Sequence, residues 1–588
     1  MAPRARAVSP WLGRALRLFF VAQFPLLALA TRGASSWSAA RVVELVAFTA
    51  LGFLGVSLDR RRDARAGVAL SAAAYLVLAV RFYRFYHTTI DAKVVESLLY
   101  SWRDVWPVVA PALPAVLATV AVVALFEYAL LATSAGAFAP PRRLAVGGAV
   151  AVVTLCAAAP ALGVGQRYFA RSASEERRVE LPELPSTRAR LPNVLVLLTE
   201  SVRASDYCAG HGADCATSPE LDRLLPDRIA LTGMRAVASY TAVSVAALFT
   251  GKPPLGSLGD VAATPGYFDY LKAVRAGGHA PAVAYWSAQL DSVFWRRDVR
   301  HAVDSFVAVD DLVGHGVGDE DEVIADGVDR MLTTYTEQHL RTLPTPFSLV
   351  LHFQGTHAPY FVDEAHAPFQ PMSHTVSWSG LTELHAAYRD AIFEQDRSIA
   401  RCVRAFLDRV RAEPWVIVFT SDHGEAFGEH GAIHHGQNLY DEQIHVPAWI
   451  AASNGGLDDA ELEHLRSYRD SVVTHFDVLP TLLDVAGVLD GYALAGRRRS
   501  LIGRSLVAAH RELERPVPMT NCTALFPCPL DTWGMLDGEH ALVAQPWDAD
   551  FRCVALRTAT TGASDDCASL RTASSEWFAL KPNGRKNR

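Results

Sequence analysis

The chain has 588 residues, of which 50% are apolar and only 20% are charged. This composition excludes a disordered or collagen-like protein, and a net charge of −7 argues against a protein that binds nucleic acid through phosphate contacts. The mean hydropathy of +0.14 is unusual for a soluble enzyme and indicates membrane segments.

The N-terminal third is almost continuously apolar and predicts five membrane spans. Each approaches the ~20 apolar residues that cross a bilayer, and the third is the shortest. The predicted spans are residues 15–30, 40–58, 67–80, 105–131 and 144–163. Buried core helices are the alternative, and the scarcity of acidic residues through five successive segments argues against it.

The arginines of this region predict its orientation. They gather before the first span, between the second and third, and between the fourth and fifth, so these ends are expected in the cytoplasm. An odd number of spans then places everything after about Gly165 outside. Basic residues in the loop 81–106 depart from this rule, and we interpret that aromatic-rich loop as an interfacial segment. A signal peptide is the alternative for the first span, because Ala28-Leu29-Ala30 resembles a cleavage site, but the pattern favours retention.

Changes in composition predict the domain boundaries. We expect a transmembrane domain over residues 1–165, a charged and proline-bearing linker over 166–191, a catalytic domain over 192–510, and a C-terminal subdomain and tail over 511–588.

The cysteines indicate an oxidising compartment such as a periplasm. Six of them lie close together in sequence as Cys208/Cys215, Cys522/Cys528 and Cys553/Cys567. Disulfides within these three close pairs are the simplest of the many possible connectivities. The tail is expected to form a small β-subdomain tied by disulfides. Cys156 and Cys402 are expected to be buried thiols.

After Leu191 the pattern changes to short apolar runs separated by helical stretches. Such runs predict buried strands of a mostly parallel α/β sheet that is covered on both faces. The expected strands are residues 193–199, 282–285, 347–353 and 415–420. In such sheets functional groups collect just past the carboxyl ends of the strands.

Carboxylates and imidazoles follow several of these strands. Glu200 ends the first run, His357 follows the third, and Asp422 and His423 follow the last. A mixed oxygen and nitrogen ligand set suits Zn²⁺ or Mn²⁺ better than Ca²⁺. Solvated loop side chains are the alternative, and it is stronger for His430 or His434 than for the Asp422/His423 pair.

Two hydroxyl residues, Thr241 and Ser244, precede or begin an apolar helical stretch. A hydroxyl at a helix start usually caps the helix. The same position directs backbone N–H groups at a bound anion, so it also suits a hydroxyl that attacks phosphate. The residues alone leave both interpretations open.

Five motifs in order resemble the alkaline phosphatase/sulfatase superfamily over residues 191–506. They are NVLVLLTES, TAVSVAALFTG, SDHGEAFGEHG with HHG, IHVP, and HFDVLPTLLDVAG. Together with the predicted spans, they resemble the membrane-anchored branch of lipid A phosphoethanolamine transferases and lipoteichoic acid synthases.

The resemblance implies roles for individual residues. It implies one divalent metal, Zn²⁺ or Mn²⁺, with a second metal left open, and a threonine nucleophile. The implied metal ligands are Glu200, Thr241, Asp422 and His423, with Thr241 as nucleophile; the implied substrate residues are His357, His435, Trp295 and Arg297. Ala288 stands where lipoteichoic acid synthases have a histidine, which puts recognition of glycerol phosphate in doubt. Packing beneath a loop is the alternative role for Trp295.

The resemblance also bears on the reaction. The stretch around Thr241 lacks the Cys/Ser-x-Pro-x-Arg context of formylglycine sulfatases, so that chemistry is excluded. The expected function is transfer of a phosphoethanolamine or phosphoglycerol headgroup from a phospholipid to an envelope glycan or lipid through a phospho-threonine. The expected location is a bacterial-type inner membrane with the catalytic domain on the periplasmic side. A hydrolase of phosphate or sulfate esters and an inactive envelope scaffold are the alternatives.

Overall fold

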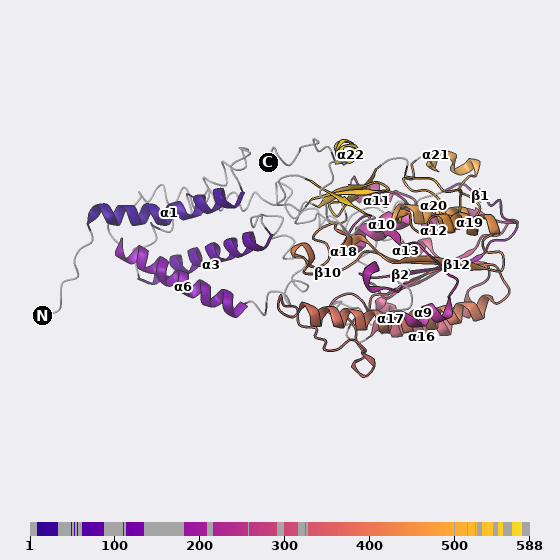
Figure 1. The fold of residues 1–588 in the computed structure, drawn as a ribbon, viewed down its shortest axis with the longest axis horizontal. Coiled ribbons are helices and arrows are strands. Elements are labelled where there is room, and N and C mark those ends of the chain that lie inside the picture. The colour runs from indigo at the N-terminus through magenta and orange to yellow at the C-terminus, as the bar shows by residue number, and fades with distance from the viewer. Residues whose placement is uncertain are drawn as a thin grey trace. The chain divides into compact units, whose positions relative to one another are not determined.

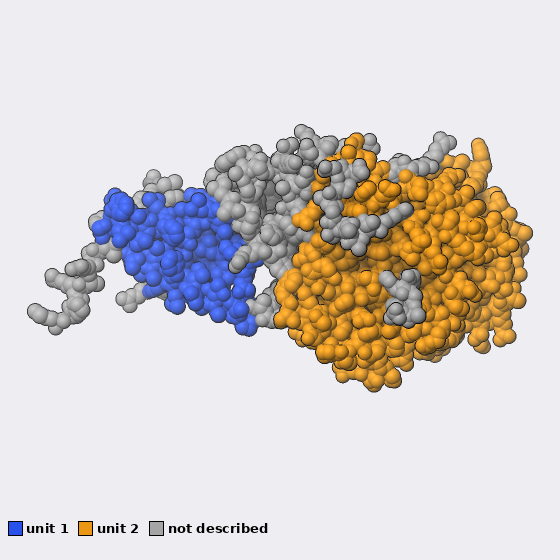
Figure 2. Space-filling view, in the orientation of Figure 1, with its two compact units in different colours: residues 1–173, 546–550, 583–588 blue, residues 174–545, 551–582 orange. Residues whose placement is uncertain are grey.

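The protein is described by a computed structural model. The described residues are 9–32, 49, 52, 56, 62–86, 110, 113–134, 181–208, 216–256, 258–290, 299–314, 324, 327–498, 500–513, 516–523, 525, 532–544, 551–556 and 567–578. Contacts divide the chain into two compact units (Figure 2). Unit 1 comprises residues 1–173, 546–550 and 583–588, and unit 2 comprises residues 174–545 and 551–582.

Unit 1 contains three described long helices, α1 (Pro10–Arg32), α3 (Arg62–Tyr86) and α6 (Leu113–Thr133) (Figure 1). Among the described residues, α3 and α6 are long and apolar enough to cross a membrane. The three helices cover the predicted spans 15–30 and 67–80 and most of 105–131. The predicted spans 40–58 and 144–163 lie almost entirely outside the described residues.

Two hydrogen bonds link polar groups of the described helices in unit 1. Gln23 of α1 donates to the carboxylate of buried Glu127 of α6 over 3.3 Å. The buried Arg17 guanidinium donates to the carbonyl oxygen of Ser134 over 2.9 Å. Polar side chains of apolar helices are typically satisfied in this way, by partners within the bundle.

Unit 2 is built on a seven-stranded sheet with the order β3-β12-β9-β2-β8-β6-β7. The strands are β2 (Asn193–Thr199), β3 (Ile229–Ala230), β6 (Ala282–Ser287), β7 (Ser305–Val307), β8 (Phe347–His352), β9 (Trp415–Ser421) and β12 (Ala448–Ser453). The four strands predicted from sequence are confirmed. The sheet is mixed, because β12 runs antiparallel to both of its neighbours, while β9, β2, β8, β6 and β7 are parallel.

Helices cover both faces of this sheet (Figure 1). One layer contains α10 (Thr241–Thr250), α12 (Tyr267–Ala273) and α20 (His475–Val485), and the other contains α9 (Pro219–Leu224), α16 (Val328–His339) and α17 (Leu381–Val410). All seven residues of β2 are buried, which explains its continuous apolar run. Cys402 of α17 is a buried free thiol, as predicted.

Shorter elements complete unit 2. The paired strands are β1 (Leu184–Pro185) with β5 (Val274–Arg275), β4 (Gly233–Arg235) with β13 (Val472–Thr474), and β10 (Ala426–Phe427) with β11 (Ile433–His434). The short helices are α11 (Leu258–Ala262), α13 (Val299–Ala302), α14 (Val309–Val313), α18 (Asp441–Ile444), α19 (Asp459–Ser467) and α21 (Ala495–Arg498).

The C-terminal part is an antiparallel sheet followed by a helix. Its elements are β14 (Val517–Thr520), β15 (Trp533–Leu536), β16 (His540–Ala544), β17 (Arg552–Ala555) and α22 (Ala568–Phe578). The predicted disulfide Cys553–Cys567 is confirmed. Cys208 and Cys522 are also disulfide-bonded. Their predicted partners, Cys215 and Cys528, lie outside the described residues.

The end of the predicted linker is packed into unit 2. Leu184 and Pro185 pair with β5. The Ser186 hydroxyl donates to the carbonyl oxygen of Ala486 over 2.7 Å, and the Thr187 amide donates to that of Gly487 over 2.8 Å. The chain is therefore fixed to this unit several residues before β2 begins. The predicted domain boundaries themselves stay a prediction.

Candidate active site

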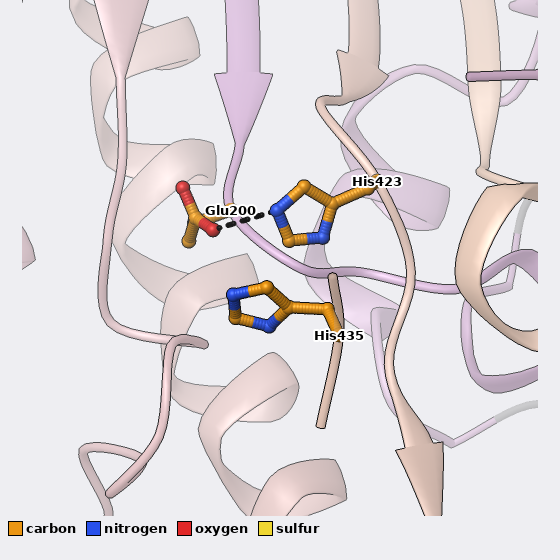
Figure 3. Close-up of side chains that lie close together, drawn as sticks. All are labelled: Glu200, His423 and His435. Atoms are coloured by element: carbon orange, nitrogen blue, oxygen red, sulfur yellow. Dashed lines mark ion pairs between the residues drawn. The ribbon is translucent and has the colours of Figure 1, made fainter. Parts of the chain in front are cut away.

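The candidate site lies at the carboxyl ends of β2, β8 and β9. Thr199 of β2 lies opposite Ser421 of β9, so Glu200 and Asp422 follow at adjacent strand ends. Glu200, Asp422 and His423 are fully buried. His423 Nε2 lies 3.3 Å from Glu200 Oε1 and 3.3 Å from Asp422 Oδ2; Figure 3 shows the Glu200 contact.

Helix α10 brings a hydroxyl to this cluster. Thr241 is its first residue, and Oγ1 donates to Glu200 Oε1 over 3.1 Å and lies 3.2 Å from His423 Nε2. Ser244 points elsewhere, because its hydroxyl donates to the backbone oxygen of Asp422 and lies 3.0 Å from His475 Nδ1. Of the two hydroxyls that the sequence left open, Thr241 is the one beside the carboxylate and the imidazole.

Neighbouring groups orient the two carboxylates. Asp422 Oδ1 accepts the amides of Ser201 over 2.9 Å and of His423 over 2.7 Å. Ser201 adopts a left-handed conformation with φ 57°, which is uncommon for a residue with a side chain and is typical of functional sites. Its hydroxyl donates to Glu200 Oε1 over 3.0 Å, and Gln289 Nε2 donates to Glu200 Oε2 over 2.6 Å.

The donor set fits a divalent cation. Asp422 Oδ2 is buried and accepts no hydrogen bond from any described residue. His423 Nδ1 lies 3.0 Å from the carbonyl oxygen of Gly424, so its N–H donates there and Nε2 is the ring atom that faces the carboxylates. Two carboxylates, an imidazole nitrogen and the Thr241 hydroxyl form a mixed set that suits Zn²⁺ or Mn²⁺.

The charges of the cluster favour a cation. Burial alone would raise the pKa of Glu200, but His423, His357 and His435 hold it well below its ordinary value. Burial and the Glu200 charge raise the pKa of Asp422. Burial opposes the charge on His423, yet Asp422 and Glu200 raise its pKa to about 9. Without a metal, protons therefore supply the positive charge that balances these carboxylates.

Two further predicted histidines approach the cluster. The His435 ring centroid lies 4.3 Å from that of His423 and 5.3 Å from that of His357. Figure 3 shows His435 beside Glu200 and His423. His435 Nδ1 lies 3.0 Å from buried Glu425. Burial alone would raise the pKa of Glu425, but His435 and His434 hold it far below its usual range, so Glu425 orients His435 as an ionised acceptor.

Sequence reasoning missed His352, Gln289 and Glu425. His352 is the last residue of β8, and burial lowers its pKa to about 4. A histidine at the end of an apolar strand gives no signal that separates it from an ordinary core residue. Gln289 lies just past β6, where its amide reaches Glu200. Glu425 belongs to the SDHGE motif that identified its neighbours, and this position could have been singled out there.

The substrate side of the prediction remains untested. Trp295 and Arg297 lie outside the described residues. Ala288 is described and fully buried, so no polar side chain occupies the position at which lipoteichoic acid synthases have a histidine. The headgroup contacts stay a prediction from the resemblance.

Comparison with known proteins fits this geometry. The family model described as Sulfatase matches residues 192–488, which is just over half of the chain and holds all the site residues described above. The chain belongs to the sulfatase family. The resemblance to this superfamily that the five motifs predicted is thus confirmed.

Two curated relatives of this sulfatase-family chain match over short segments. The phosphatidylethanolamine transferase Mcr-1 of Escherichia coli is 32% identical over 150 residues, which cover 24% of this chain and 26% of Mcr-1. The uncharacterized sulfatase YidJ of Escherichia coli K12 is 29% identical over 174 residues, which cover 27% of this chain and 31% of YidJ. The chain thus spans about a quarter to a third of the length of these relatives.

A solved structure matches over a longer range. The integral membrane lipooligosaccharide phosphoethanolamine transferase A (EptA) of Neisseria meningitidis has a TM-score of 0.50 and 16% identity, and the match covers 84% of this chain and 98% of EptA. At this identity the likeness concerns the fold. It supports the α/β sulfatase-like architecture of unit 2.

Proposed function

We propose that this chain is a membrane phosphotransferase. It moves a phospho-alcohol headgroup, phosphoethanolamine or phosphoglycerol, from a phospholipid to an envelope glycan or lipid through a covalent phospho-Thr241. The observation that carries this proposal is the position of Thr241 Oγ1, 3.1 Å from Glu200 and 3.2 Å from His423 at the start of a helix. A hydroxyl between a carboxylate and an imidazole is set for deprotonation, and the helix start favours a bound anion.

The proposed chemistry has two displacements. Thr241 Oγ1 loses its proton to water and attacks the phosphorus, and the bond from phosphorus to the diacylglycerol oxygen breaks. An acceptor hydroxyl then attacks phospho-Thr241, the Thr241–phosphorus bond breaks, and the Thr241 oxygen takes up a proton from water to restore the hydroxyl. A Zn²⁺ or Mn²⁺ ion held by Glu200, Thr241, Asp422 and His423 would lower the pKa of the hydroxyl and neutralise phosphoryl oxygens.

His435 is the residue that transfers protons to and from the substrate oxygens. Glu425 fixes His435 through Nδ1, so Nε2 is the atom that exchanges a proton with the substrate. His435 gives a proton to the leaving diacylglycerol oxygen and takes one from the acceptor hydroxyl. His357, whose ring lies 5.3 Å from that of His435, contacts the substrate phosphate or a second metal.

The membrane placement is part of the proposal. A phospholipid donor requires a site that reaches lipid headgroups, and five spans with the catalytic domain on the periplasmic side would provide it. The two membrane-capable helices among the described residues and the EptA fold support this arrangement. Reporter fusions at Pro141 and Pro185 should report cytoplasm and periplasm respectively, and the same compartment at both sites would contradict the topology.

Mass spectrometry of the full-length protein in detergent, incubated with a phospholipid of labelled headgroup, tests the function. A headgroup adduct should appear on Thr241, together with diacylglycerol. Thr241→Ala should lose the adduct and at least ~10³-fold of turnover, whereas Thr241→Ser should keep part of both because serine still offers a hydroxyl.

Addition of acceptor separates the two candidate reactions. Transfer leaves a modified acceptor, whereas the alternative hydrolase releases the free phospho-alcohol from the same adduct. An adduct that maps to Ser244, or wild-type turnover in Thr241→Ala, would overturn the nucleophile assignment.

A further inference from the structure

Two buried polar atoms at the site lack hydrogen-bond partners among the described residues. They are Asp422 Oδ2 and His352 Nε2, and both side chains are fully buried. An unsatisfied buried polar atom costs about 1–3 kcal/mol. Native proteins rarely leave two such atoms in one place unless a bound group satisfies them.

The residues that carry these two atoms lie close together. The nearest ligand atoms of Glu200, His352 and Asp422 all lie within 4.8 Å of one another. His352 approaches from the end of β8, while the two carboxylates follow β2 and β9. His352 is therefore a candidate metal ligand that the motif assignment does not contain.

The other nitrogen of His352 has a partner suited to a metal-bound imidazole. The Tyr285 hydroxyl lies 2.9 Å from His352 Nδ1. Tyr285 is fully buried, and its hydroxyl oxygen can accept a hydrogen bond. A proton on His352 Nδ1 would then donate to the Tyr285 oxygen and leave the Nε2 lone pair directed at the carboxylates. Histidines bound to metals typically donate their second N–H in this way.

We propose that His352 Nε2 is a further ligand of the cation held by Glu200, Thr241, Asp422 and His423, with Tyr285 as its positioning residue. This inference rests on the metal of the proposed function. It makes the site a two-imidazole centre and places one ligand on each of the strands β8 and β9 that flank β2. The alternative, an Nε2–H that donates to Asp422 Oδ2 directly or through water, leaves one imidazole on the metal and is distinguished below.

Pulsed electron paramagnetic resonance of the full-length protein in detergent, loaded with Cu²⁺ as the probe metal, tests the assignment, because the remote nitrogen of each bound imidazole modulates the spin echo. The wild type should show the combination lines of at least two imidazoles. His352→Leu, which fills similar space without a nitrogen, should lose the contribution of one. His464→Leu, on α19 with its ring near the Val507 carbonyl, is the matched histidine control and should leave the spectrum unchanged.

Metal affinity supplies a second measurement. Competition of Zn²⁺ with a chelator should show about 100-fold weaker binding in His352→Leu and about 10-fold weaker binding in Tyr285→Phe, because loss of a supporting partner typically costs 10–100-fold. Circular dichroism should show both variants folded. If His352→Leu unfolds, the Tyr285→Phe affinity decides.

The outcomes distinguish a failure of the proposed metal centre from a failure of the role of His352. A wild type that binds no metal would overturn the metal centre of the proposed function. A wild type that binds metal with one imidazole, or an unchanged spectrum and affinity in folded His352→Leu, would overturn the role of His352 and leave the proposed function standing.

Discussion

Two ionic clusters with buried members can be compared, one fully buried and one that reaches the surface at Glu429 and His385. The first is the candidate site, with Glu200, Asp422, His423 and His352. The second begins three residues later at Arg203 and includes Asp206, His385 and Glu429. Both contain carboxylates and an imidazole, so composition alone does not separate them. The hydrogen bonds of their polar atoms distinguish the two clusters.

The second cluster is internally satisfied. Arg203 Nε bonds Asp206, its Nη1 lies 2.8 Å from Glu429 Oε1, and His385 Nε2 lies 2.8 Å from Asp206 Oδ2. None of these side chains has a buried nitrogen or oxygen without a partner. Burial works against the charge of Arg203, but Asp206, Tyr388 and Glu429 together raise its pKa. In the first cluster, by contrast, Asp422 Oδ2 has only the ion-pair contact with His423 Nε2 over 3.3 Å, and neither it nor His352 Nε2 has a hydrogen bond to a described residue. The difference indicates that the second cluster stabilises the fold and that the first has donor atoms suited to binding a ligand.

The largest expected effect comes from Asp422→Asn. Asparagine keeps the oxygen that accepts the Ser201 and His423 amides, and it replaces the unmatched Oδ2. Turnover should fall at least ~10³-fold and Zn²⁺ affinity by ~10²-fold or more, while the unfolding free energy of the metal-free protein stays equal or rises. Kinetics, chelator competition and denaturant unfolding without metal measure the three. A large loss of metal-free stability would break the comparison.

Asp206→Asn should give the opposite result. It leaves the buried Arg203 charge with a weaker partner, and breaking such a pair costs about 3 kcal/mol of unfolding free energy. Zn²⁺ affinity per folded molecule should remain within about threefold of the wild type. Denaturant unfolding and chelator competition measure these two quantities. A variant with unchanged stability and lost metal binding would show that the second cluster belongs to the active site.

Asp396 lies outside both clusters and is intermediate between them: it is hydrogen-bonded, but its pKa is raised. Asp396 accepts the amides of Glu220 over 2.7 Å and Leu221 over 3.2 Å, yet burial raises its pKa to about 7. Since the pKa is raised in the folded state, the stability from this group is complete below about pH 4 and is lost as pH rises through about 7.

Asp396→Asn should therefore lose one hydrogen-bond acceptor at every pH. Its stability should lack the pH dependence that ionisation of Asp396 causes in the wild type. Its stability deficit against the wild type at pH 5 should shrink by about 2.5 kcal/mol at pH 8. Thermal unfolding followed by intrinsic fluorescence at the two pH values measures this. A deficit that is constant with pH would show that Asp396 is ionised throughout and belongs with the fully satisfied carboxylates.

The smallest expected effect is that of Ser244→Ala. Its hydroxyl donates to the Asp422 carbonyl and lies beside His475. Like the side chains of the second cluster, it is satisfied within the protein, although it neighbours the site. Turnover should change less than ~10-fold, with a stability loss of about 1–2 kcal/mol from the unmatched groups that remain. Steady-state kinetics beside Thr241→Ala gives the contrast, and equal losses in both variants would contradict it.

Much of the fold was predictable because buried parallel strands have continuous apolar runs. That signal gave β2, β6, β8 and β9. It does not give strand direction, so the antiparallel β12 was not anticipated. In unit 1 the hydropathy signal gives length and composition of a helix, and the structure describes only part of that region.

The candidate site was predictable where a residue follows a strand. Glu200, Asp422 and His423 come directly after β2 and β9, and parallel strands end at one edge. Thr241 needed the family resemblance, because a cap and a nucleophile look alike in sequence. His352 was missed for a physical reason: it is the last residue of β8, and only the three-dimensional register shows that its neighbours are carboxylates rather than apolar side chains.

The helix that carries Thr241 has a consequence for timescales. All ten residues of α10 are buried, and its last turn closes at Gly251 with φ 65°. Amides in such a position exchange with solvent only when a large part of the domain opens. We therefore expect the amides of residues 245–250 to be among the slowest to exchange in unit 2. Motions that limit the rate of turnover would then have to come from the substrate and the loops around the site, since Thr241, the proposed nucleophile, belongs to one of the least mobile parts of unit 2.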